Sequence, residues 1–231
     1  MMDFPSFAAA YDHFSRDNAY NELYERPAMR ALLPADLRGL TILDAGCAGG
    51  LQAEWMAQRG ARVVAVDCDA DMTAIAERRL AGRARVVRAD LVEPLAFIDD
   101  RSIDYVFCSL TLHYLRDWGP TLSEFRRVLA DGGRLLVSTH HPCADCTWGG
   151  TDYFEIEQLT QVWTEFGDTH YEVTFYRRPL SETVAALQRA GFLLERVVEP
   201  KPQPAMMQSE PRTFDKLSRQ PWFIIFDALA R

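Results

Sequence analysis

The chain has 231 residues, of which 48% are hydrophobic and 25% are charged, as is ordinary for a globular protein with a substantial core. Its net charge of −8 disfavours a nucleic-acid partner, because an acidic surface repels phosphate backbones. Residues 1–17 have no basic start and no apolar run, and no stretch of membrane-spanning length follows, so we expect neither a signal peptide nor a membrane partner.

The first half of the chain predicts a parallel sheet. Before residue 41 the sequence is helical and aromatic. From residue 41 to about 140, short runs of Val, Ile and Leu alternate with helical runs that end at glycines. The strands show little polar alternation, which is typical of strands buried on both faces of a parallel sheet. We expect strands at 41–46, 62–68, 84–90, 103–109 and 134–140, and helices at 51–60, 70–82 and 121–133.

The pattern changes after residue 141. Residues 141–180 are rich in aromatic and turn-forming residues. A helix is expected at 181–192, with Ser181 as its N-cap and Gly191 as its end. Two more strands follow at 192–200 and 222–231, and the proline-containing residues 201–220 between them are expected to form a loop.

A glycine-rich turn, ILDAGCAGG at residues 42–50, follows the first strand. It is not a phosphate-binding P-loop, because no lysine or hydroxyl residue follows Gly50. It fits a dinucleotide fingerprint poorly, because Ala48 and Leu51 stand where that pattern has glycines. The order Asp44, Gly46, Cys47, Ala48, Gly49, Gly50 resembles motif I of the class I S-adenosylmethionine-dependent methyltransferases, commonly D-x-G-C-G-x-G, with Ala48 in place of a glycine.

Several later motifs carry the same resemblance, which covers residues 38–141 and extends more loosely to the end of the chain. Asp67 ends the second strand, where an acid accepts bonds from ribose hydroxyls; NAD enzymes use the same device. Asp90 and Leu91 match positions that contact the adenine edge, and Met72 matches one that packs on its face. The predicted cofactor-binding residues are Tyr11, Asp44, Gly46, Cys47, Asp67, Cys68, Met72, Asp90, Leu91 and Ser109.

The acceptor side is less specific in sequence. His141 and His113 follow the fifth and fourth strands, and if the acceptor must lose a proton we expect His141 as first choice and His113 as second choice for the general base. The alternatives are a hydrogen-bond partner of the substrate and an ordinary loop histidine. Tyr11 is a candidate lid over the sulfonium. The aromatic residues of the insertion form either its own small core or the walls of an acceptor pocket: Trp148, Tyr153, Phe154, Trp163, Phe166 and Tyr176.

Cysteines raise two further hypotheses. The HHPCADC segment at residues 140–146 could ligate zinc, but no second ligand pair follows it, so we predict no metal. Cys47 is interpreted as a small buried apolar residue. The five cysteines are an odd number spread mostly through the predicted core, which favours reduced thiols and a cytoplasmic location.

The resemblance implies one α/β domain: a Rossmann-like, doubly wound, seven-stranded sheet, mostly parallel with an antiparallel last strand. We divide it into a helical cover (1–38), a cofactor-binding core (39–141), an insertion with the acceptor region (142–180) and a C-terminal helix with strands (181–231). Residues 176–192 resemble the small-molecule branch called type 11 methyltransferases. The expected function is methyl transfer from S-adenosylmethionine, with S-adenosylhomocysteine as product, to a small, partly aromatic molecule. The alternatives are a non-catalytic S-adenosylmethionine-binding protein and an NAD-dependent oxidoreductase.

Overall fold

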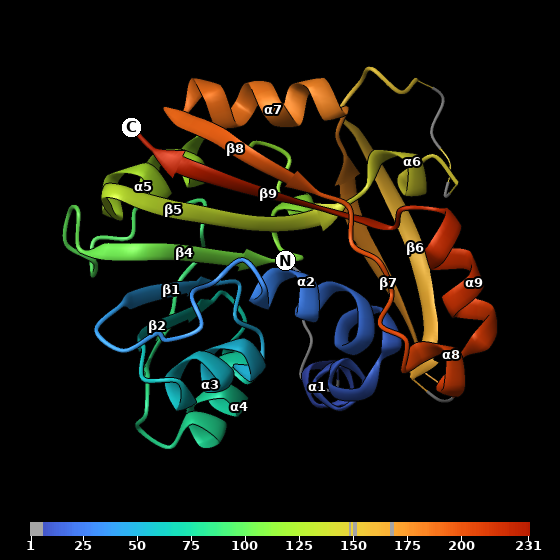
Figure 1. Ribbon diagram of the computed structural model, residues 1–231, viewed down its shortest axis with the longest axis horizontal. Helices are drawn as coiled ribbons and strands as arrows, with labels where there is room; N and C mark the ends of the chain where they lie inside the picture. The colour runs from blue at the N-terminus through green and yellow to red at the C-terminus, as the bar shows by residue number, and fades with distance from the viewer. Residues whose placement is uncertain (1–6, 148, 150–151, 167–168) are drawn as a thin grey trace.

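The computed structural model describes residues 7–147, 149, 152–166 and 169–231. Its main sheet has seven strands in the order β3-β2-β1-β4-β5-β9-β8 (Figure 1). Only β9 runs antiparallel to its neighbours, which confirms the predicted sheet. The strands are β1 Thr41–Ala45, β2 Arg62–Asp67, β3 Arg85–Arg88, β4 Ile103–Ser109, β5 Leu129–His140, β8 Phe192–Val198 and β9 Phe223–Ala230.

Helices cover both faces of this sheet, as the apolar strands require. Helices α3 (Leu51–Gln58) and α4 (Ala70–Leu80) pack with α2 (Arg26–Arg30) into one buried cluster. Helices α5 (Gly119–Val128) and α7 (Leu180–Arg189) pack into the other, on the opposite face (Figure 1). Neighbouring residues of β1 divide between the clusters, Ile42 in the first and Leu43 in the second, because successive side chains of a strand point to opposite faces.

Three boundaries differ from the sequence-based predictions. Helix α5 ends at Val128 and β5 begins at Leu129, because Leu129 pairs with Ile103 at the start of β4. Ser181 lies inside α7, whose N-cap is Pro179. Residues 201–220 are not a simple loop: they contain α8 (Met206–Ser209) and α9 (Pro211–Arg219). These short helices form because their apolar residues reach a third buried cluster that also contains Tyr24 and Phe223.

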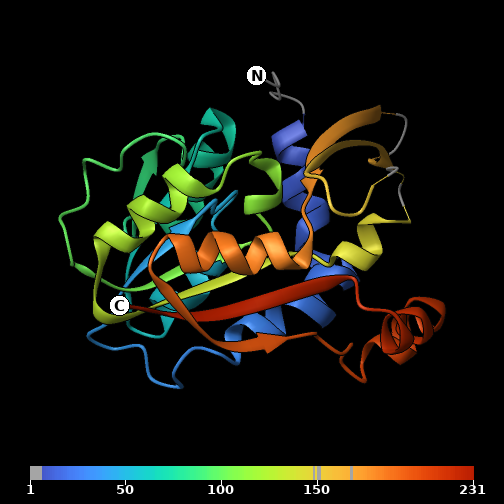
Figure 2. The same ribbon diagram turned by 90° about the horizontal axis from the view of Figure 1, so that it is seen from above.

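The N-terminal segment and the insertion lie side by side at one end of the sheet (Figures 1 and 2). The former comprises α1 (Phe7–Asp17), a π-helix η1 (Asn21–Glu25) and α2. The latter comprises α6 (Pro142–Asp145) and an antiparallel hairpin of β6 (Glu157–Phe166) and β7 (Thr169–Arg177). Ring contacts join α1 to this hairpin: Phe7 meets Tyr171 with centroids 4.6 Å apart, and Tyr11 stacks on Trp163 at 6.1 Å. No helix in the described part of the chain has the length and apolar character needed to cross a membrane.

Candidate active site

A cavity of about 590 Å³ lies at the carboxyl ends of β1, β2 and β4, where open α/β sheets bind their ligands. Helix α1, the π-helix η1 and strand β7 also contribute to its walls. All ten predicted cofactor-binding residues line this one cavity. Its other lining residues are Phe7, Ser15, Asn21, Glu25, Arg26, Ala48, Gly49, Leu51, Gln52, Asp69, Leu110, Thr111, Tyr114, Leu115, Val173, Thr174 and Tyr176.

The glycine-rich turn is shaped by left-handed backbone and close contacts. Gly46 has φ +78°, and a Cβ there would lie 2.2 Å from Thr111 Oγ1, so only glycine fits without movement. Ala48, which stands where the family pattern has glycine, also adopts a positive φ of 45°. Its backbone N–H donates to Asp67 Oδ2 at 2.8 Å. The alanine therefore keeps the left-handed turn, supported by the carboxylate of the next strand.

Asp67 ends β2, where its carboxylate supports the glycine-rich turn and also lines the cavity. Its Oδ2 accepts from Ala48 and its Oδ1 accepts from the Asp69 N–H at 3.0 Å. Burial raises the pKa of Asp67, although these backbone bonds act in the opposite direction. Each carboxylate oxygen can accept more than one bond, so lone pairs remain for a ligand. Asp69 in turn caps α4 by accepting the Met72 N–H at 2.8 Å, which holds Met72 at the cavity wall.

Asp44 and Gln52 present unpaired polar atoms where a ligand would lie. Asp44 is 1% exposed, and its Oδ2 has no partner. Burial raises the pKa of Asp44 to about 7. Gln52 Nε2 is also buried without a partner. The ionised carboxylate of Asp44 can accept hydrogen bonds from the ammonium group of an amino acid, and the Gln52 amide can donate to its carboxylate. These residues therefore fit the methionine end of S-adenosylmethionine.

The remaining predicted cofactor residues show ordinary surroundings. Asp90 is exposed at the cavity rim and accepts the Val92 N–H at 3.1 Å, while Leu91 is 6% exposed. Burial raises the pKa of the Cys47 thiol well above its usual value. Cys47 therefore stays protonated and acts as a small apolar wall residue, and burial likewise raises the pKa of Cys68 to about 11.

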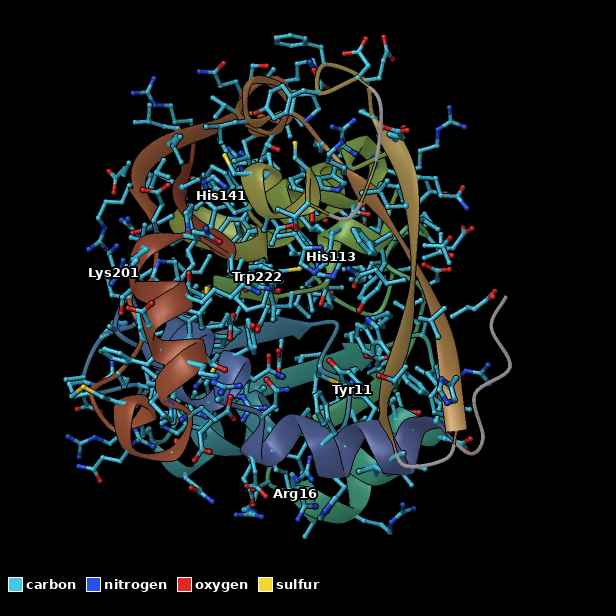
Figure 3. All side chains as sticks on the ribbon, turned by 90° about the vertical axis from the view of Figure 1, so that its right-hand side faces the viewer. Tyr11, Arg16, His113, His141, Lys201 and Trp222 are labelled. Carbon is cyan, nitrogen blue, oxygen red and sulfur yellow. The ribbon has the colours of Figure 1, made fainter. Side chains whose placement is uncertain are left out.

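Helix α1 is fastened over the glycine-rich turn by a buried ion pair. Asp12 Oδ2 lies 2.8 Å from an Arg79 nitrogen of α4, and both side chains are less than one-tenth exposed. Arg79 also donates to the Gly49 carbonyl, so one guanidinium joins the helix to the turn. Tyr11, one residue before Asp12, lines the cavity beside the hairpin (Figure 3).

The two predicted catalytic histidines do not line the cavity, which corrects our expectation for their position. His141 is the N-cap of α6: its Nδ1 accepts the Cys143 N–H at 3.1 Å, and its Nε2 lies 3.0 Å from Glu199 Oε1. His113 is 3% exposed and stacks on His140 with ring centroids 3.9 Å apart. Burial lowers the pKa of His113 well below its usual value. His141 lies outside the cavity because the chain turns into α6 immediately after β5, whereas His113 lies on the short 3-10 helix η2 (Leu112–Tyr114) that follows β4.

The insertion contributes to the cavity through part of its aromatic set. Tyr176 lines the cavity, and Trp163 supports Tyr11 from behind. Phe154 is 79% exposed elsewhere and contacts Tyr153. Trp148 lies outside the described residues, as does the side chain of Phe166. Within the described ranges, no group of three or more His, Cys, Asp or Glu side chains is arranged to hold a metal ion.

Glu25 on η1 and Arg26 on α2 are two charged residues that line the cavity and that no sequence-based prediction included. Glu25 is 1% exposed. No motif marks these residues. The available signal was an acid between Tyr24 and Pro27 in a segment otherwise expected to pack on the sheet.

Comparisons with known proteins agree with this geometry. Residues 43–137 match the family described as "Methyltransferase domain". An uncharacterized protein of Haemophilus influenzae is 28% identical over 90% of this chain and 87% of its own length. The ubiquinone biosynthesis O-methyltransferase of Xanthomonas oryzae is 38% identical, but the match spans only 45% of this chain and 44% of that protein.

Solved structures give the same fold over nearly the whole chain. An S-adenosylmethionine-dependent methyltransferase from Mesorhizobium loti has a TM-score of 0.71 at 26% identity, covering 93% of this chain and 99% of that one. A putative one from Listeria monocytogenes has a TM-score of 0.75 at 21% identity, covering 90% and 96%.

Proposed function

We propose that this chain, which is a class I S-adenosylmethionine-dependent methyltransferase, transfers the methyl group to an oxygen atom of a small molecule that enters the same cavity as the cofactor. One observation carries the proposal. The cavity that gathers the ten predicted cofactor residues continues past them to polar and aromatic side chains of α1, η1 and β7. Its volume of about 590 Å³ is in the usual range for a small-molecule site.

We assign the cofactor's parts to the residues that complement them. Asp67 would accept the ribose hydroxyls, and Asp90 with the Leu91 N–H would meet the adenine edge. Asp44 would receive the ammonium of the methionine end. The ligand's positive charge would stabilise the Asp44 carboxylate and lower its raised pKa. The bound cofactor supplies a methyl group on a sulfonium, and loss of this methyl group leaves a neutral thioether.

The remaining protein groups align the acceptor and exclude water. Because the leaving group is neutral, little stabilisation of it is needed, and the rate depends mainly on positioning. Tyr11 and Phe7 from α1, with Tyr176 and Val173 from β7, would cover the reacting methyl on the side away from the sheet. These walls suit a flat, partly apolar acceptor. The relative from Xanthomonas oryzae named as an O-methyltransferase supports oxygen as the acceptor atom. All five cysteines are free thiols, which supports a cytoplasmic site of action.

Calorimetry and methyl transfer together test this function. S-adenosylhomocysteine should bind with one site per chain, and label from S-adenosylmethionine should appear in members of a panel of phenols, carboxylic acids and amines. Absence of binding would overturn the cofactor assignment. Binding with transfer only to amines would overturn the choice of oxygen.

A further inference from the structure

Glu25 is a buried carboxylate that joins the N-terminal segment to the ends of the central strands. It is 1% exposed and lines the cavity. Ser109, at the end of β4, donates its hydroxyl to Glu25 Oε1 at 2.8 Å, and Ser138 on β5 donates to the same oxygen at 2.5 Å. Two hydroxyls on one oxygen fix the carboxylate and leave the other oxygen as its free acceptor.

The backbone around this contact is irregular on both sides. Glu25 closes the π-helix η1, and single π-turns of this kind are frequent at functional sites. Leu110, the residue after Ser109, has φ +49°, and its N–H donates to Ser138 Oγ at 3.0 Å. Strained backbone of this kind persists where surrounding contacts hold it, and here Ser138 links the strained residue to Glu25.

The charge of Glu25 is not used in an ion pair of the described structure. Burial raises the pKa of Glu25, and the two serine bonds and the nearby Arg26 and Arg30 only partly oppose this. Asp44 and Tyr11 are the other titratable groups that interact with it. A buried carboxylate that is costly to ionise and borders a ligand cavity is the arrangement expected of a proton acceptor.

We propose that Glu25 is the general base of this methyltransferase and that its acceptor is an O–H acid of the phenol class. The proposal rests on the proposed function. A phenol must lose its proton as its oxygen attacks, whereas a neutral amine can lose one afterwards. A carboxylate acceptor needs no base and would be repelled by Glu25. The aromatic walls from Phe7, Tyr114 and Tyr176 suit a flat ring.

The step balances in charge and atoms. A lone pair of the acceptor oxygen forms the bond to the methyl carbon, and the carbon–sulfur bond breaks with its electrons remaining on sulfur. The phenolic proton passes to the free oxygen of Glu25 and reaches water after the product leaves. The positive sulfonium and the negative carboxylate are thus neutralised in the same step, which favours reaction in a site shielded from water.

Glu25→Gln tests the proposal, because the amide oxygen can still accept from both serines but the side chain takes no proton. Glu22→Gln is the matched control, since Glu22 is an exposed acid on the same π-helix. With unsubstituted catechol as acceptor, whose hydroxyls stay protonated at neutral pH, and saturating S-adenosylmethionine, Glu25→Gln should lower kcat at least about 100-fold and remove the rising limb of the pH–rate profile. Its affinity for S-adenosylhomocysteine should stay within about threefold of the wild type, and Glu22→Gln should match the wild type throughout.

Each other outcome overturns a defined statement. Unchanged kcat and pH profile in Glu25→Gln would remove the base assignment. A loss of S-adenosylhomocysteine affinity as large as the loss of turnover would make Glu25 a cofactor ligand instead. Methylation of aniline but not of catechol or other phenols by the wild type would overturn the acceptor class, whereas failure to bind S-adenosylhomocysteine would overturn the proposed function itself.

Discussion

The two halves of the cavity are built in different ways. The half that we assign to the cofactor is made of backbone turns and carboxylates at the ends of β1, β2 and β3, each set by residues close in sequence. The half that we assign to the acceptor is made of side chains from η1, the end of β4 and the hairpin strand β7, which are far apart in sequence. Motifs formed by neighbouring residues can be recognised in the sequence without a structure. A cavity wall built from segments far apart in sequence depends on how those segments pack together.

The halves also differ in what holds them. The glycine-rich turn is anchored in the sheet, where the Gly46 and Cys47 N–H groups donate to Val66 at 2.8 and 2.9 Å. Helix α1 and the hairpin together form what we call the roof of the cavity, and this roof is held by the Asp12–Arg79 ion pair and by ring contacts between the two elements. Variants of the first half should therefore change cofactor affinity directly, and variants of the second should act through the position of the roof.

The largest expected effect is at Asp67. Asp67→Ala removes two acceptors for the ribose and the support of the Ala48 and Asp69 N–H groups, and should cost about 3 kcal/mol of binding, or about 100-fold in S-adenosylhomocysteine affinity. Asp71→Ala, an exposed acid on the same helix-capping turn, is the control. Unchanged affinity in a folded Asp67→Ala protein, measured by calorimetry, would remove Asp67 from the cofactor site.

Asp12→Asn tests the roof. Breaking the ion pair with Arg79 should lower the free energy of local opening of α1 by about 2 kcal/mol. This is less than the usual cost of breaking a buried pair, because Arg79 keeps its bond to Gly49. Hydrogen exchange of the α1 amides should accelerate about 30-fold, since local opening follows this free energy. Asp17→Asn, at the exposed end of α1, should not change the exchange rates. Equal protection in both variants would show that ring contacts alone hold the roof.

The pH dependence of cofactor affinity should reveal Asp44. Its pKa of about 7 in the free protein means that it is largely protonated at pH 6, and the cofactor's cation favours the ionised form. Affinity should therefore rise about tenfold from pH 6 to pH 8, with proton release on binding below pH 7. The raised pKa of Asp44 also makes the free protein less stable as pH rises from about 4 to 7, because the carboxyl of the unfolded chain loses its proton at a lower pH than that of the folded chain.

Asp44→Asn provides the comparison for that prediction. It should bind S-adenosylhomocysteine more weakly at pH 8 and show a flatter pH dependence. Calorimetry in two buffers of different ionisation enthalpy measures the protons released. If Asp44→Asn keeps the full tenfold rise in affinity, the pH dependence is caused by Asp67 or Glu25, whose pKa values burial also raises.

The smallest effect is expected at His141. His141→Ala removes the cap on the Cys143 N–H and the contact with Glu199, and should cost about 1 kcal/mol of stability. Turnover and cofactor affinity should stay within about twofold, because the imidazole lies outside the cavity. Chemical denaturation and a pH–rate profile check these expectations. A fall in turnover of more than about tenfold in a folded His141→Ala protein would restore the histidine to the mechanism.

The sequence determined the fold and brought together the residues that we assign to the cofactor. The apolar strands, the glycine helix ends and the spacing from Asp44 through Asp67 to Asp90 are local patterns, and parallel strands bring their carboxyl ends to one edge of a sheet. Even Ala48, which departs from the family pattern, is placed by the turn that precedes it.

Tertiary structure decided the acceptor half. The sequence favoured His141 as the base because it follows a predicted strand, whereas no motif marks Glu25. His141 turns outward because a residue just after β5 caps α6, whereas Glu25 turns inward because a π-turn directs it to Ser109 and Ser138. The difference depends on contacts between residues 84 and 113 positions apart, and periodicity within a segment carries no information about such pairs.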